Sequence, residues 1–148
     1  MARAGWAVGV ALALVLVGCG NDDDNGDGGN GRNGDAATEA TVSIAAPGDD
    51  EEVTSPVAIE MEADGITIEP AGEVRDGAGH FHIIVDVGCV DPGETIPMTE
   101  GYNHFGMGQT EAEVELEPGE HELCLQAGDG AHTALDATDE ITITVAGA

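Results

Sequence analysis

The sequence has no lysine, and its 3 basic residues, all arginine, stand against 30 acidic ones, for a formal net charge of −27. So strong a negative charge makes nucleic acids and anionic lipid head groups poor partners. Two interpretations of the acidity stay open. One is a solvated acidic surface, as in salty surroundings where ions screen the self-repulsion. The other is a surface that attracts cations.

Signals for catalysis are also scarce. Ser43 and Ser55 are the only serines, and neither lies in a G-x-S-x-G turn. No C-x-x-C pair occurs, and no glycine-rich phosphate loop precedes a recognisable helix. With so many carboxylates, a close acidic pair carries no information. We therefore expect a protein that is not an enzyme.

The first eighteen residues have the pattern of a secretory signal peptide. Arg3 precedes an apolar run from 7 to 17, which is too short to span a bilayer. The run ends in LVGC, which resembles the lipobox of bacterial lipoproteins. That resemblance implies a lipidated Cys19 at the mature N-terminus. The alternative is an ordinary secretory signal with an incidental cysteine. We predict an exported chain, lipid-anchored to the membrane and facing the periplasm or the cell exterior.

Residues 19–38 are almost entirely glycine, asparagine and aspartate. This segment has little apolar surface to bury, so we predict a disordered acidic linker. A calcium loop at Asp22, Asp24 and Asp27 is disfavoured, because the glutamate that closes an EF-hand loop is missing. The remaining residues, 39–147, have the length of one small domain.

Apolar residues alternate with polar ones along most of this domain, which predicts strands. The segment 57–62 has this pattern, as does the closing segment 139–147. Residues 111–130 have it on both sides of Pro118-Gly119, which predicts a hairpin. With turn signals throughout, the pattern predicts an all-β domain, a single immunoglobulin-like β-sandwich of about seven short strands.

One strand, in the segment GHFHIIVD, differs from the others, because FHIIVDV is apolar on both faces at its middle. His80 and His82 lie two positions apart and so share one face with Ile84. A strand covered on both faces is usually central in its sheet. The opposite face carries Phe81, Ile83, Val85 and Val87.

Cys89 follows this strand, and Cys124 lies in a later predicted strand. Export to an oxidising compartment favours a disulfide between them. With Cys19 lipidated, the remaining cysteine count is even. Two separate buried thiols are the alternative.

Several motifs occur together in a fixed order: GHFHIIVD, HFGMGQTEAEVEL, PGEHELCLQAGDGAH and ITITV. In this combination the chain resembles the bacterial domain of unknown function 4399 family, over residues 79–145. The resemblance implies a small exported domain and no particular reaction. The family pattern often has a further histidine where Phe81 stands here. The matching positions are Gly79, His80, His82, Asp86, His104, Phe105, Gly106, Gly108, Gln109, Thr110, Pro118, Gly119 and His132.

Four histidines are candidate ligands for copper or zinc, because imidazole is the commonest metal-binding side chain for such ions. They are His80, His82, His104 and His132. His104 and His132 stand in glycine-rich segments, and nearby Met98 and Met107 would favour copper. His121 follows a turn and is left out of the set. The histidines would otherwise form a structural polar cluster, or line a groove for a peptide, glycan or small molecule.

Two functions follow from these observations. The first is a monomeric, non-catalytic, lipid-anchored module of the cell envelope that binds an envelope protein or a wall component. The second is a copper- or zinc-binding lipoprotein that uses the four histidines.

Overall fold

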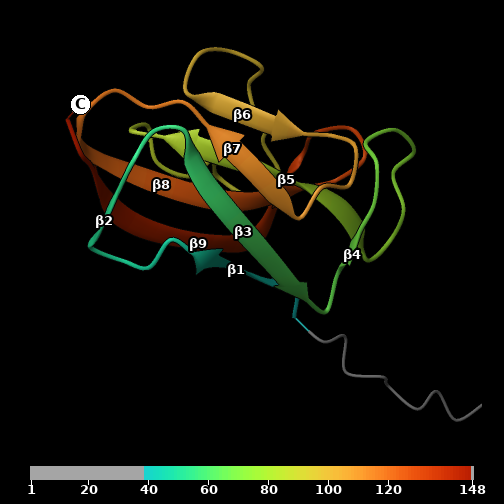
Figure 1. Ribbon diagram of the computed structural model, residues 1–148. Helices are drawn as coiled ribbons and strands as arrows, with labels where there is room; N and C mark the ends of the chain where they lie inside the picture. The colour runs from blue at the N-terminus through green and yellow to red at the C-terminus, as the bar shows by residue number, and fades with distance from the viewer. Residues whose placement is uncertain (1–38, 148) are drawn as a thin grey trace, which may run out of the picture. The chain divides into compact units, whose positions relative to one another are not determined.

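The computed structural model describes residues 39–147, which form nine strands and no helix (Figure 1). The predicted all-β class is confirmed. The two strands beyond the predicted seven are accounted for by β2 and β4, which are only 3 and 2 residues long. The signal peptide, Cys19 and the linker lie outside the described residues. The strands are β1 (Thr41–Ala46), β2 (Glu51–Val53), β3 (Val57–Asp64), β4 (Thr67–Ile68), β5 (Ala78–Val85), β6 (Tyr102–Phe105), β7 (Glu111–Val114), β8 (Gly119–Gly128) and β9 (Ala134–Val145).

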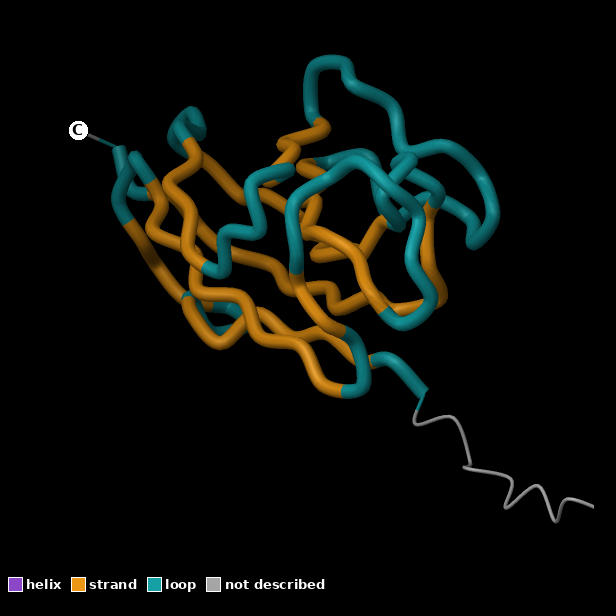
Figure 2. Tube along the Cα trace, turned by 90° about the vertical axis from the view of Figure 1, so that its right-hand side faces the viewer, coloured by secondary structure: helices purple, strands orange, loops and turns teal. Residues whose placement is uncertain are grey.

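The strands form two sheets in a sandwich-like arrangement, as predicted (Figures 1 and 2). The smaller sheet has the order β1-β3-β7. The larger has the order β2-β9-β8-β5-β4, with β6 also paired to β5. Most pairs are antiparallel, but β2 runs parallel to β9 and β4 parallel to β5.

None of the residues 39–147 belongs to a helix that is long and apolar enough to cross a membrane.

Aliphatic side chains fill the core between the sheets. Alternate residues of β3, namely Val57, Ile59 and Met61, are at most 3% exposed. Phe81 and Ile83 of β5 meet them from the larger sheet and are fully buried. Burying one such side chain stabilises a fold by roughly 1.5–3 kcal/mol.

β5 is the central strand that the sequence predicts. All 8 of its residues are buried, with β8 along one edge and β4 and β6 along the other. Its second face is therefore covered as well as the face in the core. The strand ends at Val85, because Asp86 adopts a left-handed φ of 58°. Val87 is consequently 57% exposed, so its predicted place on the core face was wrong.

The hairpin predicted for residues 111–130 was also wrong. β7 pairs with β3 in the smaller sheet, whereas β8 pairs with β5 and β9 in the larger one. Pro118 and Gly119 therefore lie where the chain crosses between sheets. The alternation of apolar and polar residues indicates that each strand has one buried face, but it does not indicate which strand pairs with it in the sheet.

The predicted disulfide between Cys89 and Cys124 is confirmed. It joins β8 to the segment that follows β5, across 35 positions of sequence. By the chain-entropy model, closing a loop of this length stabilises the fold by roughly 3–4 kcal/mol. Leu123 and Leu125 belong to the core, so Cys124 lies on the other face of β8, the face shared with the histidines of β5.

Candidate metal centre

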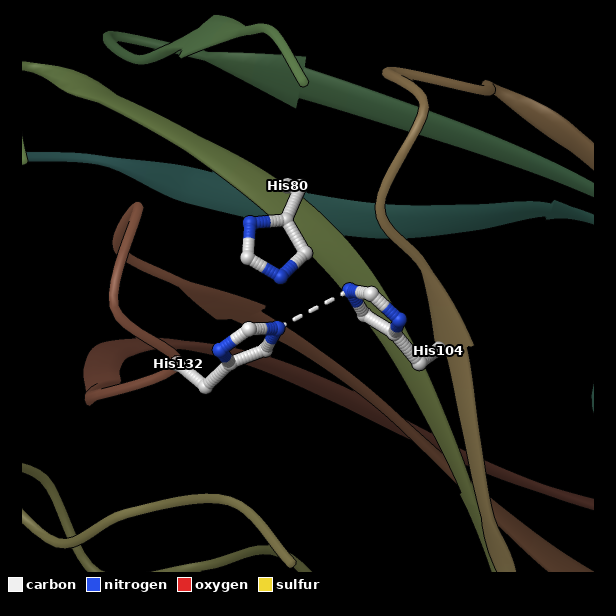
Figure 3. Close-up of side chains that lie close together, drawn as sticks. All are labelled: His80, His104 and His132. Carbon is white, nitrogen blue, oxygen red and sulfur yellow. Dashed lines mark hydrogen bonds between the residues drawn. The ribbon is translucent and has the colours of Figure 1, made fainter. Parts of the chain in front are cut away.

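Four of the five histidines lie together on the face of the larger sheet that points away from the core. His80 and His82 belong to β5, His104 to β6, and His132 to the segment between β8 and β9. The ring centroids of all six pairs are between 4.7 and 5.8 Å apart. Figure 3 shows three of the rings pointing toward one another. These four histidines are called the histidine cluster below.

Strand geometry explains three of the four positions. Side chains alternate along β5, so His80 and His82 face away from the core in which Phe81 and Ile83 lie. His104 is the direct cross-strand partner of His82 in the antiparallel pair of β5 and β6. Directly opposite residues project to the same side of a sheet, which brings His104 to the same face.

Two glycines leave room for the rings. A Cβ atom at Gly106 would overlap the ring of His104. One at Gly128 would lie 3.1 Å from Nε2 of His82. Gly106, one of the positions that match the family pattern, therefore lies directly against the ring of the candidate ligand His104.

The segment 129–133 positions His132. Oδ1 of Asp129 accepts hydrogen bonds from the backbone N–H groups of Ala131 and Thr133, both at 2.8 Å. The N–H of His132 donates to the carbonyl of Asp129 at 2.9 Å. His132 itself has a φ of 68°, a conformation that costs a non-glycine residue roughly 1–2 kcal/mol. One carboxylate oxygen therefore organises the turn that presents this ring. In the sequence, Asp129 stands out only as the first residue of an Asp-Gly turn signal.

The ring nitrogens have spacings close to those of a metal site. Nε2 of His80 lies 3.0 Å from Nε2 of His82, and Nε2 of His132 lies 3.1 Å from Nε2 of His104. Ligand nitrogens of His80, His104 and His132 all lie within 4.8 Å of one another. Nitrogens bound at ~2.0–2.1 Å around one tetrahedral ion are about 3.3 Å apart. Small ring movements would therefore give this geometry at His80, His104 and His132, whereas His82 approaches this group at Nε2 of His80.

Burial and mutual repulsion keep the inner rings neutral. Burial, followed by the neighbouring His104 and His132, lowers the pKa of His80 to about 4. Burial and the three other histidines lower the pKa of His82 to about 3. Burial and then His132 lower the pKa of His104. Near neutral pH these imidazoles therefore keep the lone pairs that a metal ion requires.

The hydrogen bonds of these rings argue against a purely structural cluster. Among residues 39–147, the four rings hydrogen-bond only to one another, and none bonds a backbone carbonyl. The buried Nδ1 atoms of His80 and His82 have no hydrogen-bond partner. An unpaired buried polar atom costs roughly 1–3 kcal/mol. Histidines that served only to hold turns would be expected to form hydrogen bonds between their ring nitrogens and the backbone.

His121 has the structural arrangement that the cluster lacks. Its Nδ1 lies 2.7 Å from Oδ2 of Asp86, and its Nε2 donates to the carbonyl of Glu117 at 2.8 Å. Burial lowers the pKa of His121, but these two hydrogen bonds and the charge of Asp86 outweigh it and raise the pKa overall. Leaving His121 out of the candidate ligand set agrees with this geometry.

Other motif positions shape the segments around the cluster. The turn after β6 contains Gly108, with a φ of 77°, and Gln109, whose Oε1 accepts from the N–H of Met107 at 2.8 Å. Thr110 continues it, accepting a backbone hydrogen bond from Met61 at 2.8 Å. Gly79 packs against the backbone of Gly128, and Phe105 is partly buried against the core.

The two methionines give copper no support. Met98 and Met107 are 61% and 78% exposed, whereas the histidine rings are buried or half-buried. A soft thioether ligand would be expected to turn inward beside the rings.

Fold and site together define an all-β sandwich domain in which three members of the histidine cluster, His80, His104 and His132, form a group that could hold a metal ion. The family model described as Domain of unknown function (DUF4399) matches residues 59–146, and the chain belongs to this family. The match includes the whole histidine cluster and both disulfide cysteines.

No curated protein matches the sequence. Among solved structures, the chain is similar to part of the endo-beta-1,4-mannanase from Thermotoga petrophila, with 18% identity and a TM-score of 0.44. The match covers 78% of this chain and 22% of that chain. At this TM-score the likeness carries no argument about function.

Proposed function

We propose that this domain binds one transition-metal ion, zinc or copper(II), in the histidine cluster. The observation that carries the proposal is the set of four rings whose hydrogen bonds run only among themselves, with two Nε2–Nε2 distances of 3.0 and 3.1 Å. In each of these hydrogen bonds one neutral ring donates and the other accepts, so only one of the two nitrogens offers a lone pair, whereas a bound cation would let both nitrogens act as ligands.

The donor set supports a restricted group of ions. Imidazole nitrogen suits zinc, copper and nickel, whereas calcium and magnesium need oxygen ligands. The cluster offers no thiolate, because both described cysteines form the disulfide. Zinc requires no change of oxidation state and accepts the tetrahedral geometry that four converging rings approach.

The charge of the chain supports capture of a cation. Four neutral imidazoles do not compensate the two positive charges of the ion. The formal net charge of −27 supplies that compensation at longer range and raises the local concentration of cations. The attraction weakens as salt is added, because the acidic groups are screened.

Metal titration of the tag-free chain tests this function. The chain is stripped with a chelator and titrated with zinc, copper(II) or cobalt(II), with His80→Ala and His104→Ala as ligand variants and His121→Ala as the control. We expect one ion per chain for the wild type and the control. The metal affinity of the ligand variants should fall by more than the roughly 10–100-fold that is lost when a hydrogen-bond partner of a metal ligand is removed. Indistinguishable titrations would contradict the proposal.

We also propose that Cys19 carries a lipid that anchors the chain in the cell envelope, where the domain would meet metal ions and envelope partners. The support is the LVGC sequence after the apolar run. A Cys19→Ala variant should leave the membrane fraction, and unchanged fractionation would reject the anchor. Binding of an envelope protein or wall component is a second role, and it is compatible with the first.

A further inference from the structure

The disulfide does more than close a loop, because it fastens the segment that covers the histidine face. Residues 86–101 run from β5 to β6 and are bonded to β8 through Cys89 and Cys124. Gln126, two positions further along β8, lies on the same face. Its Oε1 accepts from the N–H of Val90 at 2.9 Å, and its Nε2 donates to the carbonyl of Val90 at 2.7 Å.

The same segment then continues to the backbone of His132. The N–H of Gly93 donates to the carbonyl of Ala134, and the N–H of Ala134 donates to the carbonyl of Glu94, both at 2.8 Å. The N–H of Ile96 donates to the carbonyl of His132 at 2.8 Å. The turn that presents His132 is therefore braced on one side by the disulfide-linked segment.

The segment also reaches the buried end of the cluster. Ile96 is fully buried. A Cβ atom at Gly128 would lie 3.2 Å from Cδ1 of Ile96 and 3.1 Å from Nε2 of His82, so both side chains border the same small space. One continuous stretch of chain therefore contacts the cluster at His82 and at His132.

We propose that the oxidation state of Cys89 and Cys124 controls the metal affinity of the histidine cluster, through the segment 86–101. This rests on the proposed metal-binding function. A dithiol reduces the bond by transferring two electrons and two protons. The S–S bond breaks, two thiols form, and the dithiol becomes its own disulfide. Residues near Val90 then lose their covalent link to β8, so ordering the segment at His82 and His132 costs more of the binding free energy.

Reduction also creates a competing site. Ligand atoms of Cys89, Cys124 and Glu140 lie within 4.8 Å of one another, and Glu140 is the cross-strand partner of Cys124. Freed thiolates beside this carboxylate would bind soft or borderline metal ions. Metal binding by the reduced chain therefore has to be separated from binding by the histidines.

The test compares cobalt(II) and zinc affinities of the full chain in three forms: oxidised wild type, wild type reduced and freed of dithiol without air, and Cys89→Ser/Cys124→Ser. Serine abolishes the thiolate site, and a thiolate-to-cobalt absorption band marks binding there. We expect the histidine-site affinity to fall roughly 10–100-fold in the serine variant. Asp139→Ala is the control, because that carboxylate accepts from the N–H of Ile44 in the smaller sheet at 2.8 Å, on the core face of β9 and not on the face that the segment covers. It should lose stability and keep its metal affinity.

The outcomes separate the two proposals. If the oxidised wild type binds no metal, the proposed function fails. If it binds metal and a folded serine variant binds equally well, the redox inference is overturned and the function stands. Should the serine variant not fold, the reciprocal measurement decides. Bound metal must raise the dithiol concentration needed to reduce the Glu140→Gln variant, under conditions where no thiolate-to-cobalt band appears, by the same factor that reduction lowers affinity. An unchanged midpoint overturns the inference.

Discussion

His82 on β5 and His104 on β6 are direct cross-strand partners, with ring centroids 5.1 Å apart. Because the ladder fixes both Cα positions, neither ring has to be ordered by a long loop. His80, two positions before His82, joins them on the same face, so two strands carry three of the four rings. Only His132 depends on a turn. A site built mainly on a sheet is largely formed before any ion arrives, which favours affinity and defined geometry.

Gly106→Ala is expected to lower metal affinity while leaving the metal-free fold nearly unchanged. The new Cβ would overlap the ring of His104, and that ring can move away only by leaving the cluster. Titration with cobalt(II) measures the loss of metal affinity. We expect a loss of roughly 10-fold or more, as when a residue that positions a metal ligand is changed. The control is Gly48→Ala, whose Cβ would meet only Oε2 of Glu51, at an ordinary 3.4 Å. Equal affinities for the two variants would contradict this role of Gly106.

Asp129→Ala should weaken metal binding more than Asp129→Asn does. Alanine removes the acceptor that both flanking N–H groups of His132 use, at 2.8 Å each. Asparagine keeps an oxygen in that place and removes only the charge. The cobalt absorption spectrum should change for alanine, because the fourth ring is no longer held in place. If both variants lose the same affinity and keep the wild-type spectrum, charge rather than positioning is the contribution of Asp129.

The metal-free chain should lose stability as the pH falls below about 6.5. The folded pKa values of His80 and His82 are lowered to about 4 and about 3. Above 6.5 both rings are neutral in the folded and unfolded chain, and the full stability is present. As the pH falls toward 3, the unfolded chain binds protons that the folded chain does not, at about 1.4 kcal/mol per proton and pH unit.

Urea unfolding in the presence of a chelator, at several pH values between about 7 and 4, measures this slope. The matched comparison is His80→Ala/His82→Ala, which retains every carboxylate and removes both rings. Its stability should fall less steeply over the same range. Parallel curves for the two proteins would mean that carboxylates alone cause the acid sensitivity.

The sequence predicted the strands and the shared face of His80 and His82, because both follow from a period of two. It did not predict that His104 would pair with His82, since alternation contains no information about neighbours. The hairpin predicted at Pro118-Gly119 was wrong for the same reason. The place of His132 depends on hydrogen bonds that Asp129 accepts and on one that Ile96 donates, and the last of these joins residues 36 positions apart. Contacts of that kind are set by the sandwich as a whole.

His121→Ala should destabilise the fold in a pH-dependent way and leave metal affinity unchanged. The pKa of His121 is raised, so its protonated form is favoured in the folded chain. Its contribution is fully present below the unfolded value of 6.5 and is lost as the pH rises through the higher folded value. Because the Asp86 side chain is 51% exposed and water screens the pair, we expect a loss of at most about 1 kcal/mol below pH 6.5. Urea unfolding of wild type and variant on both sides of this range measures the difference. An equal loss at all pH values would mean that His121 acts by packing and by its bond to the carbonyl of Glu117, not by its charge.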